Sequence, residues 1–142
     1  MVRAEFWDSI PLTMKVYDQK LEPVSRKYGM TRCEVDILLF LANNPQYDTA
    51  SEVVSRRGLA KSHVSASVDR LVRGGYLARE YRAGNRKAIH LRLLDAAADV
   101  VADGRAAQEQ FFSILLRDFS KKEQAELRRL LDKIAANLRT VQ

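Results

Sequence analysis

Hydrophobic residues recur three and four positions apart along most of the chain, which is the spacing of one face of a helix. These stretches are separated by short segments containing glycine, proline or asparagine, residues that end helices. The pattern therefore predicts a largely helical chain. The predicted helices span residues 9–28, 31–42, 49–57, 61–73, 95–116 and 121–138.

In one region the hydrophobic period changes from helical to alternating. Ile89, Leu91 and Leu93 alternate with small or polar residues, as expected for a half-buried strand. Strands are therefore expected over 77–82 and 87–93, and the residues between them tolerate the positive φ of a hairpin turn. The predicted fold class is mainly α (α+β), with one small hairpin.

Three Ser/Thr-x-x-Glu sequences support the starts of predicted helices, and they begin at Thr31, Thr49 and Ser120. In such a capping box the hydroxyl accepts from the backbone N–H three residues on, and the glutamate accepts from the backbone N–H of the cap. Two prolines bear on the first helix. We expect Pro11 in its opening turn, and a kink or an end at Pro23.

Positive charge is concentrated in about a quarter of the chain. The net charge of the 142 residues is +6, but ten Lys/Arg between Arg56 and Arg92 outnumber two acids, which gives that segment +8 and the remainder −2. Such concentration is expected where phosphates are neutralised. A solvated charged face is the plain alternative. An anionic membrane surface is disfavoured because no strongly apolar face opposes these bases.

The order of elements around this basic segment matches a winged helix-turn-helix: a helix, a tight turn at Gly58, a second helix and a basic hairpin. The second helix must bury one face in the domain and present the other to base edges in the major groove. On a helical wheel, Val64, Val68, Leu71 and Val72 share one sector. The opposite side and its flanks carry Ser62, His63, Ser65, Ala66, Asp69, Arg70 and Arg73.

Residues of this second helix suggest different roles along its length. We expect base discrimination from Ser62, His63 and Ser65, because small polar residues in the first turns allow close approach to base edges. Arg70 and Arg73, further along, are suited to phosphates or to structural pairing.

The hairpin is expected to act as a wing. Arg82, Arg86 and Lys87 flank its Gly-Asn tip, and a cationic side chain there can enter the minor groove, which is strongly negative over A·T-rich sequence. A solvated surface hairpin is the alternative, but the neighbouring helix-turn-helix favours DNA contact. Asp69 would repel a phosphate, so we expect it to pair with a neighbouring arginine.

Several of these segments resemble MarR-type regulators, the multiple-antibiotic-resistance regulator family. The similarity covers about residues 10–140 and is strongest over 51–93. It is carried by Gly29-Met30-Thr31, Leu38-Leu39, Thr49-Ala50-Ser51-Glu52-Val53, Lys61-Ser62-His63-Val64-Ser65, Val68-Asp69-Arg70-Leu71, Gly75-Tyr76-Leu77 and the wing.

The resemblance implies one domain over residues 1–142, with a winged helix-turn-helix at 31–93 and flanking dimerisation helices at 5–28 and 95–140. It implies a homodimer on a pseudo-palindromic operator in double-stranded DNA. Many relatives are repressors released by small aromatic or phenolic effectors, or by thiol oxidation. The operator, the regulated genes, the effector and the direction of regulation do not follow from the sequence.

Candidate site residues come from the basic segment and from aromatic positions. The expected DNA contacts are Lys61, Ser62, His63, Ser65, Ala66, Arg70, Arg73, Arg82, Arg86 and Lys87. The expected contacts to an effector are Trp7, Tyr17, Phe40 and Phe111, each of which has a place in the dimer or domain core as its alternative.

Three positions depart from the family pattern. Ala60 replaces a helix cap that is often serine, and Ala66 replaces a basic residue that often contacts a base. Asn85 stands where the wing usually carries aspartate, so the salt bridge of that acid is missing or remade.

Rival functions find less support in the residues. The two histidines, His63 and His90, have no metal-ligand spacing, and no catalytic motif or phosphate loop accompanies them, so we expect no enzyme, metal or cofactor. Cys33 lies in the opening turn of a helix, where the dipole can activate a thiol; burial as a small residue is the favoured interpretation. A thiol-responsive regulator, an activator, an architectural DNA-binding protein without a ligand and a protein-interaction module remain alternatives.

Cellular location follows from what the sequence lacks. No stretch approaches the roughly 18 apolar residues that span a bilayer, and the first residues do not form a signal peptide. A single cysteine suits a reducing compartment. We therefore expect a cytoplasmic protein without a membrane partner.

Overall fold

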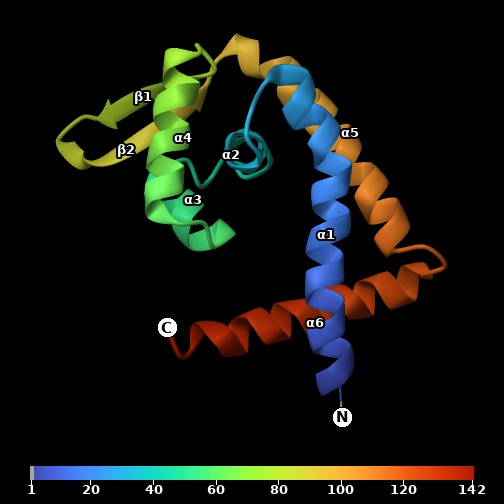
Figure 1. Cartoon of the computed structure of the whole chain (residues 1–142). Helices are drawn as coiled ribbons and strands as arrows, with labels where there is room; N and C mark the ends of the chain where they lie inside the picture. The colour runs from blue at the N-terminus through green and yellow to red at the C-terminus, as the bar shows by residue number, and fades with distance from the viewer. Residues whose placement is uncertain (1) are drawn as a thin grey trace.

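The computed structural model describes residues 2–142, and within that range the chain forms helices and one two-stranded antiparallel sheet (Figure 1). The predicted fold class, mainly α with a small hairpin, is confirmed. The elements are α1 (Arg3–Tyr28), α2 (Arg32–Asn43), α3 (Ala50–Arg57), α4 (Lys61–Arg73), β1 (Leu77–Arg82), β2 (Asn85–Leu93), the 3-10 turn η1 (Asp95–Ala97), α5 (Ala98–Leu115) and α6 (Lys121–Arg139).

Helix α2 lies at the centre of the arrangement. Figure 1 shows α1 and α5 running side by side on one side of α2, while α3, α4 and the hairpin lie on the other. The short η1 turn carries the chain from β2 back to α5. The helix-turn-helix and its hairpin are therefore mounted on a frame of two long helices.

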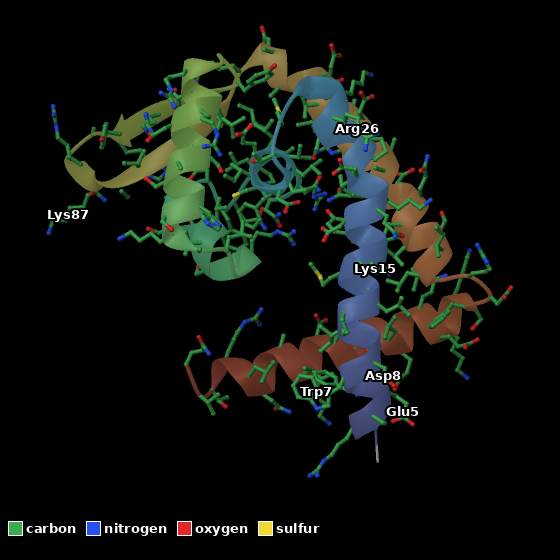
Figure 2. The ribbon with its side chains drawn as sticks, viewed as in Figure 1. Glu5, Trp7, Asp8, Lys15, Arg26 and Lys87 are labelled. Carbon is green, nitrogen blue, oxygen red and sulfur yellow. The ribbon has the colours of Figure 1, made fainter. Side chains whose placement is uncertain are left out.

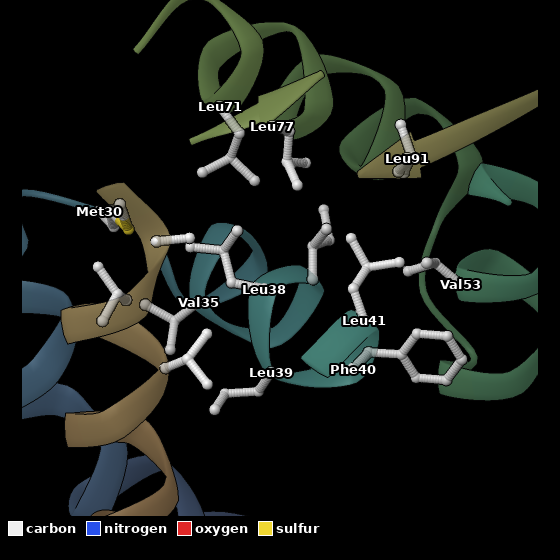
Figure 3. Close-up of a cluster of buried hydrophobic side chains, with 14 of the residues drawn as sticks. Met30, Val35, Leu38, Leu39, Phe40, Leu41, Val53, Leu71, Leu77 and Leu91 are labelled. Atoms are coloured by element: carbon white, nitrogen blue, oxygen red, sulfur yellow. The ribbon is translucent and has the colours of Figure 1, made fainter. Parts of the chain in front are cut away.

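The hydrophobic core surrounds α2, and Figure 3 shows its side chains meeting those of the neighbouring elements. Val35, Ile37 and Leu38 are fully buried, so α2 has core contacts on more than one side. Burial of such side chains is the main favourable term in folding. The neighbours contribute Leu21 from α1, Val53 from α3, Leu71 from α4, Leu77 from β1, Leu91 from β2 and Val100 from α5.

The predicted start of the first helix is wrong. Helix α1 begins at Arg3, six residues before the expected Ser9, and it passes both Pro11 and Pro23 without ending. Each proline removes one backbone donor, and both prolines lie on the exposed surface of the helix, where the freed carbonyl can bond water. The helix ends where Gly29 adopts φ +62°.

Two of the three predicted capping boxes are complete. Thr49 and Ser120 each accept from the N–H three residues on, and the glutamates return to the cap N–H. At Thr31 only the first bond forms, because the Glu34 carboxylate pairs with Arg70 instead. The box predicted at Thr31 is therefore only half formed.

The hairpin turn is tighter than predicted. Strand β1 has the expected bounds, but β2 begins at Asn85, two residues before the expected Lys87. The chain reverses over Ala83 and Gly84, and Gly84 takes φ +77°. The register pairs Leu77 with Leu93 and Glu80 with His90, and it is irregular beyond that pair.

A cluster of polar side chains ties the end of α1 to α5. Lys27 Nζ and Tyr28 Oη both donate to Asp103 Oδ2, at 2.7 and 2.6 Å. These two hydrogen bonds hold the pKa of the Asp103 carboxyl below its usual value.

None of the helices in residues 2–142 is both long and apolar enough to span a membrane.

At Gly104, α5 approaches α2 closely. A Cβ at this position would lie 2.7 Å from a methyl carbon of Leu39, which is itself buried. We expect Gly104→Val to lower the free energy of unfolding by about 3 kcal/mol, because overpacking displaces Leu39. Urea unfolding measures this, with Ala102→Val, on an exposed position of the same helix, as the control. Equal loss in both variants would contradict the tight contact.

Candidate nucleic-acid interface

Helix α4 separates a buried face from an exposed polar face, as its sequence predicts. Val64, Val68 and Leu71 are at most 3% exposed and Val72 is half-buried. Ala60 caps the helix without a side-chain hydrogen bond, as expected for alanine. The exposed positions are Lys61, Ser62, His63, Ser65, Ala66, Asp69, Arg70 and Arg73, which include every residue of α4 that the sequence nominated for DNA.

Arg70 differs from the other exposed residues of α4 because it forms an ion pair with the core helix. Its Nε donates to Glu34 Oε1 at 2.5 Å, and its NH2 group lies 3.4 Å from Ser67 Oγ. Glu34 is only 7% exposed. The structure therefore shows the structural pairing that was one of the two roles expected for Arg70.

Asp69 forms the ion pair that the sequence suggested, and its partner is Arg79 of β1. A second exposed pair, Arg92 Nε to Glu80 Oε1 at 2.5 Å, joins the two strands. Neither Arg79 nor Arg92 was among the predicted site residues. In each pair the two residues lie in different elements. No sequence spacing within a single helix or strand therefore predicts these pairs.

The wing carries its exposed cations on an irregular part of the hairpin. Arg86 and Lys87 follow the turn, and Figure 2 shows Lys87 at the outer end of the hairpin, far from α1. Asn85 Oδ1 accepts from the backbone N–H of Lys87 at 3.0 Å, so this side chain makes a local turn bond in place of the salt bridge that the resemblance implies for an aspartate there. Arg82 is ion-paired to Asp48 at 3.0 Å.

Half of the basic segment is neutralised internally. Five of its ten bases form ion pairs: Arg57, Arg70, Arg79, Arg82 and Arg92. The guanidinium of Arg56 lies 3.5 Å from the centre of the Tyr47 ring. Among the ten bases of this segment, those without an ion-pair partner within residues 2–142 are Arg56, Lys61, Arg73, Arg86 and Lys87.

A groove of about 470 Å³ separates α4 from the hairpin. Its rim carries Lys61, Arg79 and Lys87, and its floor includes Val68 and Ile89. The two elements that the sequence nominated for DNA are therefore adjacent, with positive charge along the rim between them. Sequence reasoning did not identify this groove, because it forms only when the hairpin folds back beside α4.

Three of the four predicted effector contacts converge in the structure. Tyr17 and Phe40 line a cavity of about 80 Å³ between α1, α2 and α5. Phe111 is buried, with its ring edge-on to that of Tyr17 at 5.1 Å. Trp7 lies elsewhere: it is 68% exposed near the N-terminal end of α1 (Figure 2).

The same cavity contains a charged group that the sequence did not nominate. Asp36 lines it, flanked by Arg32 at 3.1 Å and Arg57 at 3.8 Å. Burial raises the pKa of the Asp36 carboxyl, and the two guanidinium groups oppose this change. Gln108 Nε2 donates to Tyr17 Oη at 2.9 Å, which adds a polar group from α5.

Cys33 is half-buried and packs against the core. Its Sγ lies 3.8 Å from the carbonyl oxygen of His63, so it contacts the backbone of α4.

Across residues 2–142 no three side chains of the His, Cys, Asp and Glu types are grouped so that they could hold a metal ion.

Comparison with known proteins supports the family resemblance. Residues 28–88 match the sequence model of the MarR family. The chain is also 28% identical, over 125 residues, to the HTH-type transcriptional regulator PecS of Dickeya dadantii (strain 3937), a match that covers 85% of this chain and 74% of PecS. Over this part the chain is similar to the MarR family. The resemblance drawn from the sequence is confirmed.

Solved structures share the fold of this protein. The transcriptional regulator PA3341 matches with a TM-score of 0.82 at 24% identity, over 95% of this chain and 98% of that one. MarR of Staphylococcus aureus, solved in complex with salicylate and kanamycin, matches with a TM-score of 0.74 at 18% identity, over 99% and 94% of the chains. The sequence matches support a MarR-type transcriptional regulator with a DNA-binding winged helix, and the solved structures share its fold.

The Glu34–Arg70 pair fixes α4 against α2, and this predicts an effect on stability. Replacing the buried carboxylate by Glu34→Gln leaves the guanidinium without its counter-charge. We expect the free energy of unfolding to fall by about 1–2 kcal/mol, less than for a fully buried pair because Arg70 is half exposed. Urea unfolding checks this. Glu22→Gln, which breaks an exposed pair with Arg26, should change nothing measurable, and an equally neutral Glu34→Gln would contradict the role.

Proposed function

We propose that the chain is a homodimeric repressor that binds a pseudo-palindromic operator in double-stranded DNA through α4 and the wing. The observation that carries the proposal is the exposed polar face of α4 beside a groove whose rim and wing hold unpaired cations. The larger part of the affinity of such proteins comes from phosphate neutralisation, whereas sequence is distinguished by contacts to base edges.

Within this proposal the residues of α4 divide by position. Ser62, His63 and Ser65 lie on the exposed face of its first turns and discriminate bases. Ala66 is exposed and short, so it lets the helix backbone approach the groove floor. Lys61 joins them at the N-terminal end, where positive charge meets the phosphate backbone.

The remaining cations supply affinity. Arg86 and Lys87 extend from the wing toward a minor groove, whose negative potential attracts unpaired cations. Arg73, at the end of α4, suits a flanking phosphate. Arg70 holds α4 in place through Glu34.

A second copy of the chain is the proposed partner of α6. This helix has no buried residue although its apolar side chains repeat at helical spacing. Further apolar side chains are exposed near the N-terminal end of α1 and the C-terminal end of α5, and grouped exposed apolar side chains are typical of surfaces that bind a protein partner. The exposed apolar residues are Phe6, Trp7, Ile10, Leu12 and Met14 in α1, Phe112, Ile114 and Leu115 in α5, and Leu130, Leu131, Ile134 and Leu138 in α6.

The cavity at Tyr17 and Phe40 is the proposed site of a small aromatic or phenolic effector. Aromatic walls pack against a ring, while Asp36 and Arg57 offer a hydrogen-bond acceptor and donors. A structural neighbour, the S. aureus MarR, was solved with salicylate, a phenolic acid. In this chain the cavity is small, at about 80 Å³, so binding of an effector requires α1, α2 and α5 to separate slightly. Competition of salicylate with bound duplex measures the response.

Selection of duplexes from a random library, followed by footprinting, tests the central proposal. A dimeric operator reader protects a discrete inverted repeat with half-site centres about one helical turn, roughly 10 bp, apart. Uniform protection with no selected sequence would overturn sequence-specific regulation and favour an architectural role.

The wing assignment predicts a selective loss of affinity in Arg86→Ala. We expect weaker binding to every duplex and a shallower dependence of log Kd on log salt, by about one unit of slope, because one phosphate or groove contact is lost. Fluorescence anisotropy at several salt concentrations measures both. Arg128→Ala, which removes an exposed charge from α6, is the matched control. Unchanged affinity in Arg86→Ala would refute the wing assignment.

The dimer proposal predicts that a charge within the α6 stripe dissociates the protein. Leu131→Glu places a carboxylate on a side chain that is 54% exposed in the single chain and covered in the proposed dimer. We expect a shift from dimer to monomer in sedimentation equilibrium, and weaker operator binding. Lys133→Glu, exposed on the same helix, should stay dimeric. A dimeric Leu131→Glu variant would contradict this interface.

A further inference from the structure

We propose that Asp48 is a positioning residue that fixes the wing to the body of the protein, and that Arg82 serves this anchor instead of a DNA phosphate. The proposal rests on the DNA-binding role argued above, and it assigns Arg82 differently from the sequence-based expectation.

Asp48 contacts both strands of the hairpin. It lies in the loop between α2 and α3, one residue before the cap of α3. Its Oδ1 lies 2.7 Å from Nδ1 of His90 in β2, and its Oδ2 accepts from the Arg82 guanidinium in β1 at 3.0 Å. Its backbone carbonyl accepts from the N–H of Leu91 at 2.7 Å. One residue of the body therefore holds β1 through a side chain and β2 through both side chain and backbone.

The strand ladder alone does not hold the outer wing. Glu80 pairs with His90, and the next paired positions are Arg82 and Asn85, so the single residue Tyr81 faces residues 86–89. Arg86 and Lys87 lie in this irregular stretch. Arg82 stands between it and the turn, so its ion pair to Asp48 spans the part of the hairpin that the backbone pairing leaves irregular.

The body end of the anchor is well fixed. Thr49, the residue after Asp48, caps α3 in a complete capping box with Glu52 and forms an isolated β-bridge with His90. Leu91 is buried in the core next to this bridge. A shift of Asp48 would disturb the start of α3, the bridge and the core together. The Asp48 carboxylate is therefore held in a fixed position, and its contacts with the hairpin fix the distance between the wing and α4.

The imidazole of His90 adds to the anchor, because its Nδ1 contacts the Asp48 carboxylate. The ionisable groups facing it are Asp48 from the loop, Arg82 on the same carboxylate, and Glu80 opposite it in the ladder, which is itself paired with Arg92.

The anchor acts on binding more than on folding. Arg82 is 69% exposed, and exposed ion pairs contribute little to stability. A variant that breaks the pair should therefore keep its melting temperature while its wing loses a defined position. Such a separation of affinity from stability distinguishes positioning from general structural support.

The test uses the duplex selected with the wild-type protein as the probe. Asp48→Asn keeps the backbone bond to Leu91 and removes the charge; we expect its affinity to fall about three- to tenfold with an unchanged melting temperature. Arg82→Gln should lose a similar factor at an unchanged salt slope, and the double variant should lose no more than either single one. Glu80→Gln, which breaks the exposed pair to Arg92, is the control and should bind like wild type.

Two outcomes would overturn the anchor itself. One is wild-type affinity in Asp48→Asn. The other is an additive loss in the double variant together with a salt slope reduced by about one unit in Arg82→Gln, which would assign Arg82 to a phosphate. These outcomes remain distinct from failure of the DNA-binding proposal. If the anchor alone is wrong, Arg86→Ala still weakens binding; if the interface is wrong, Arg86→Ala binds as well as wild type.

Discussion

Burial of α2 on nearly all sides is the constraint on which the other elements depend. Helices α1, α3, α4 and α5 and strand β2 all contact it, so each must present an apolar face to the same helix. The side chains of the two acids in α2 can therefore reach only a few partners. Glu34 meets Arg70 of α4, and Asp36 meets Arg32 and Arg57. These polar contacts set how α4 and α3 are rotated about the core, and thereby which residues α4 exposes.

The elements were predictable because their signals are local. The apolar sector of α4, the boxes at Thr49 and Ser120 and the alternation of β2 each depend on residues within one or two turns. The same locality explains the exposed face of α4, since burying Val64 and Val68 leaves Ser62 and Ser65 outside. The first helix was harder, since an exposed proline removes one bond without stopping a helix whose other bonds remain.

The pairing of the charged side chains was not predictable from spacing. Glu34 and Arg70 are 36 positions apart, and Asp48 and Arg82 are 34 apart, so no periodicity links them. The number of bases counted from the sequence therefore exceeds the number that are free of ion pairs in the folded basic segment. The aromatic positions show the same limit. Tyr17, Phe40 and Phe111 converge because all three pack at the same side of the core. Trp7 instead lies on the exposed surface near the N-terminal end of α1.

The exposure of α6 has a consequence for when the protein is ordered. A helix of 19 residues that buries none of its side chains keeps only its cap and its neighbouring-turn contacts, and isolated helices of that length are marginal in water. In the proposed dimer, the second copy supplies the free energy that holds α6 straight. On that proposal, chains at low concentration carry this segment frayed, and it becomes ordered as the concentration rises, by mass action. The shape of this end of the molecule is then a measure of how much of the protein is present.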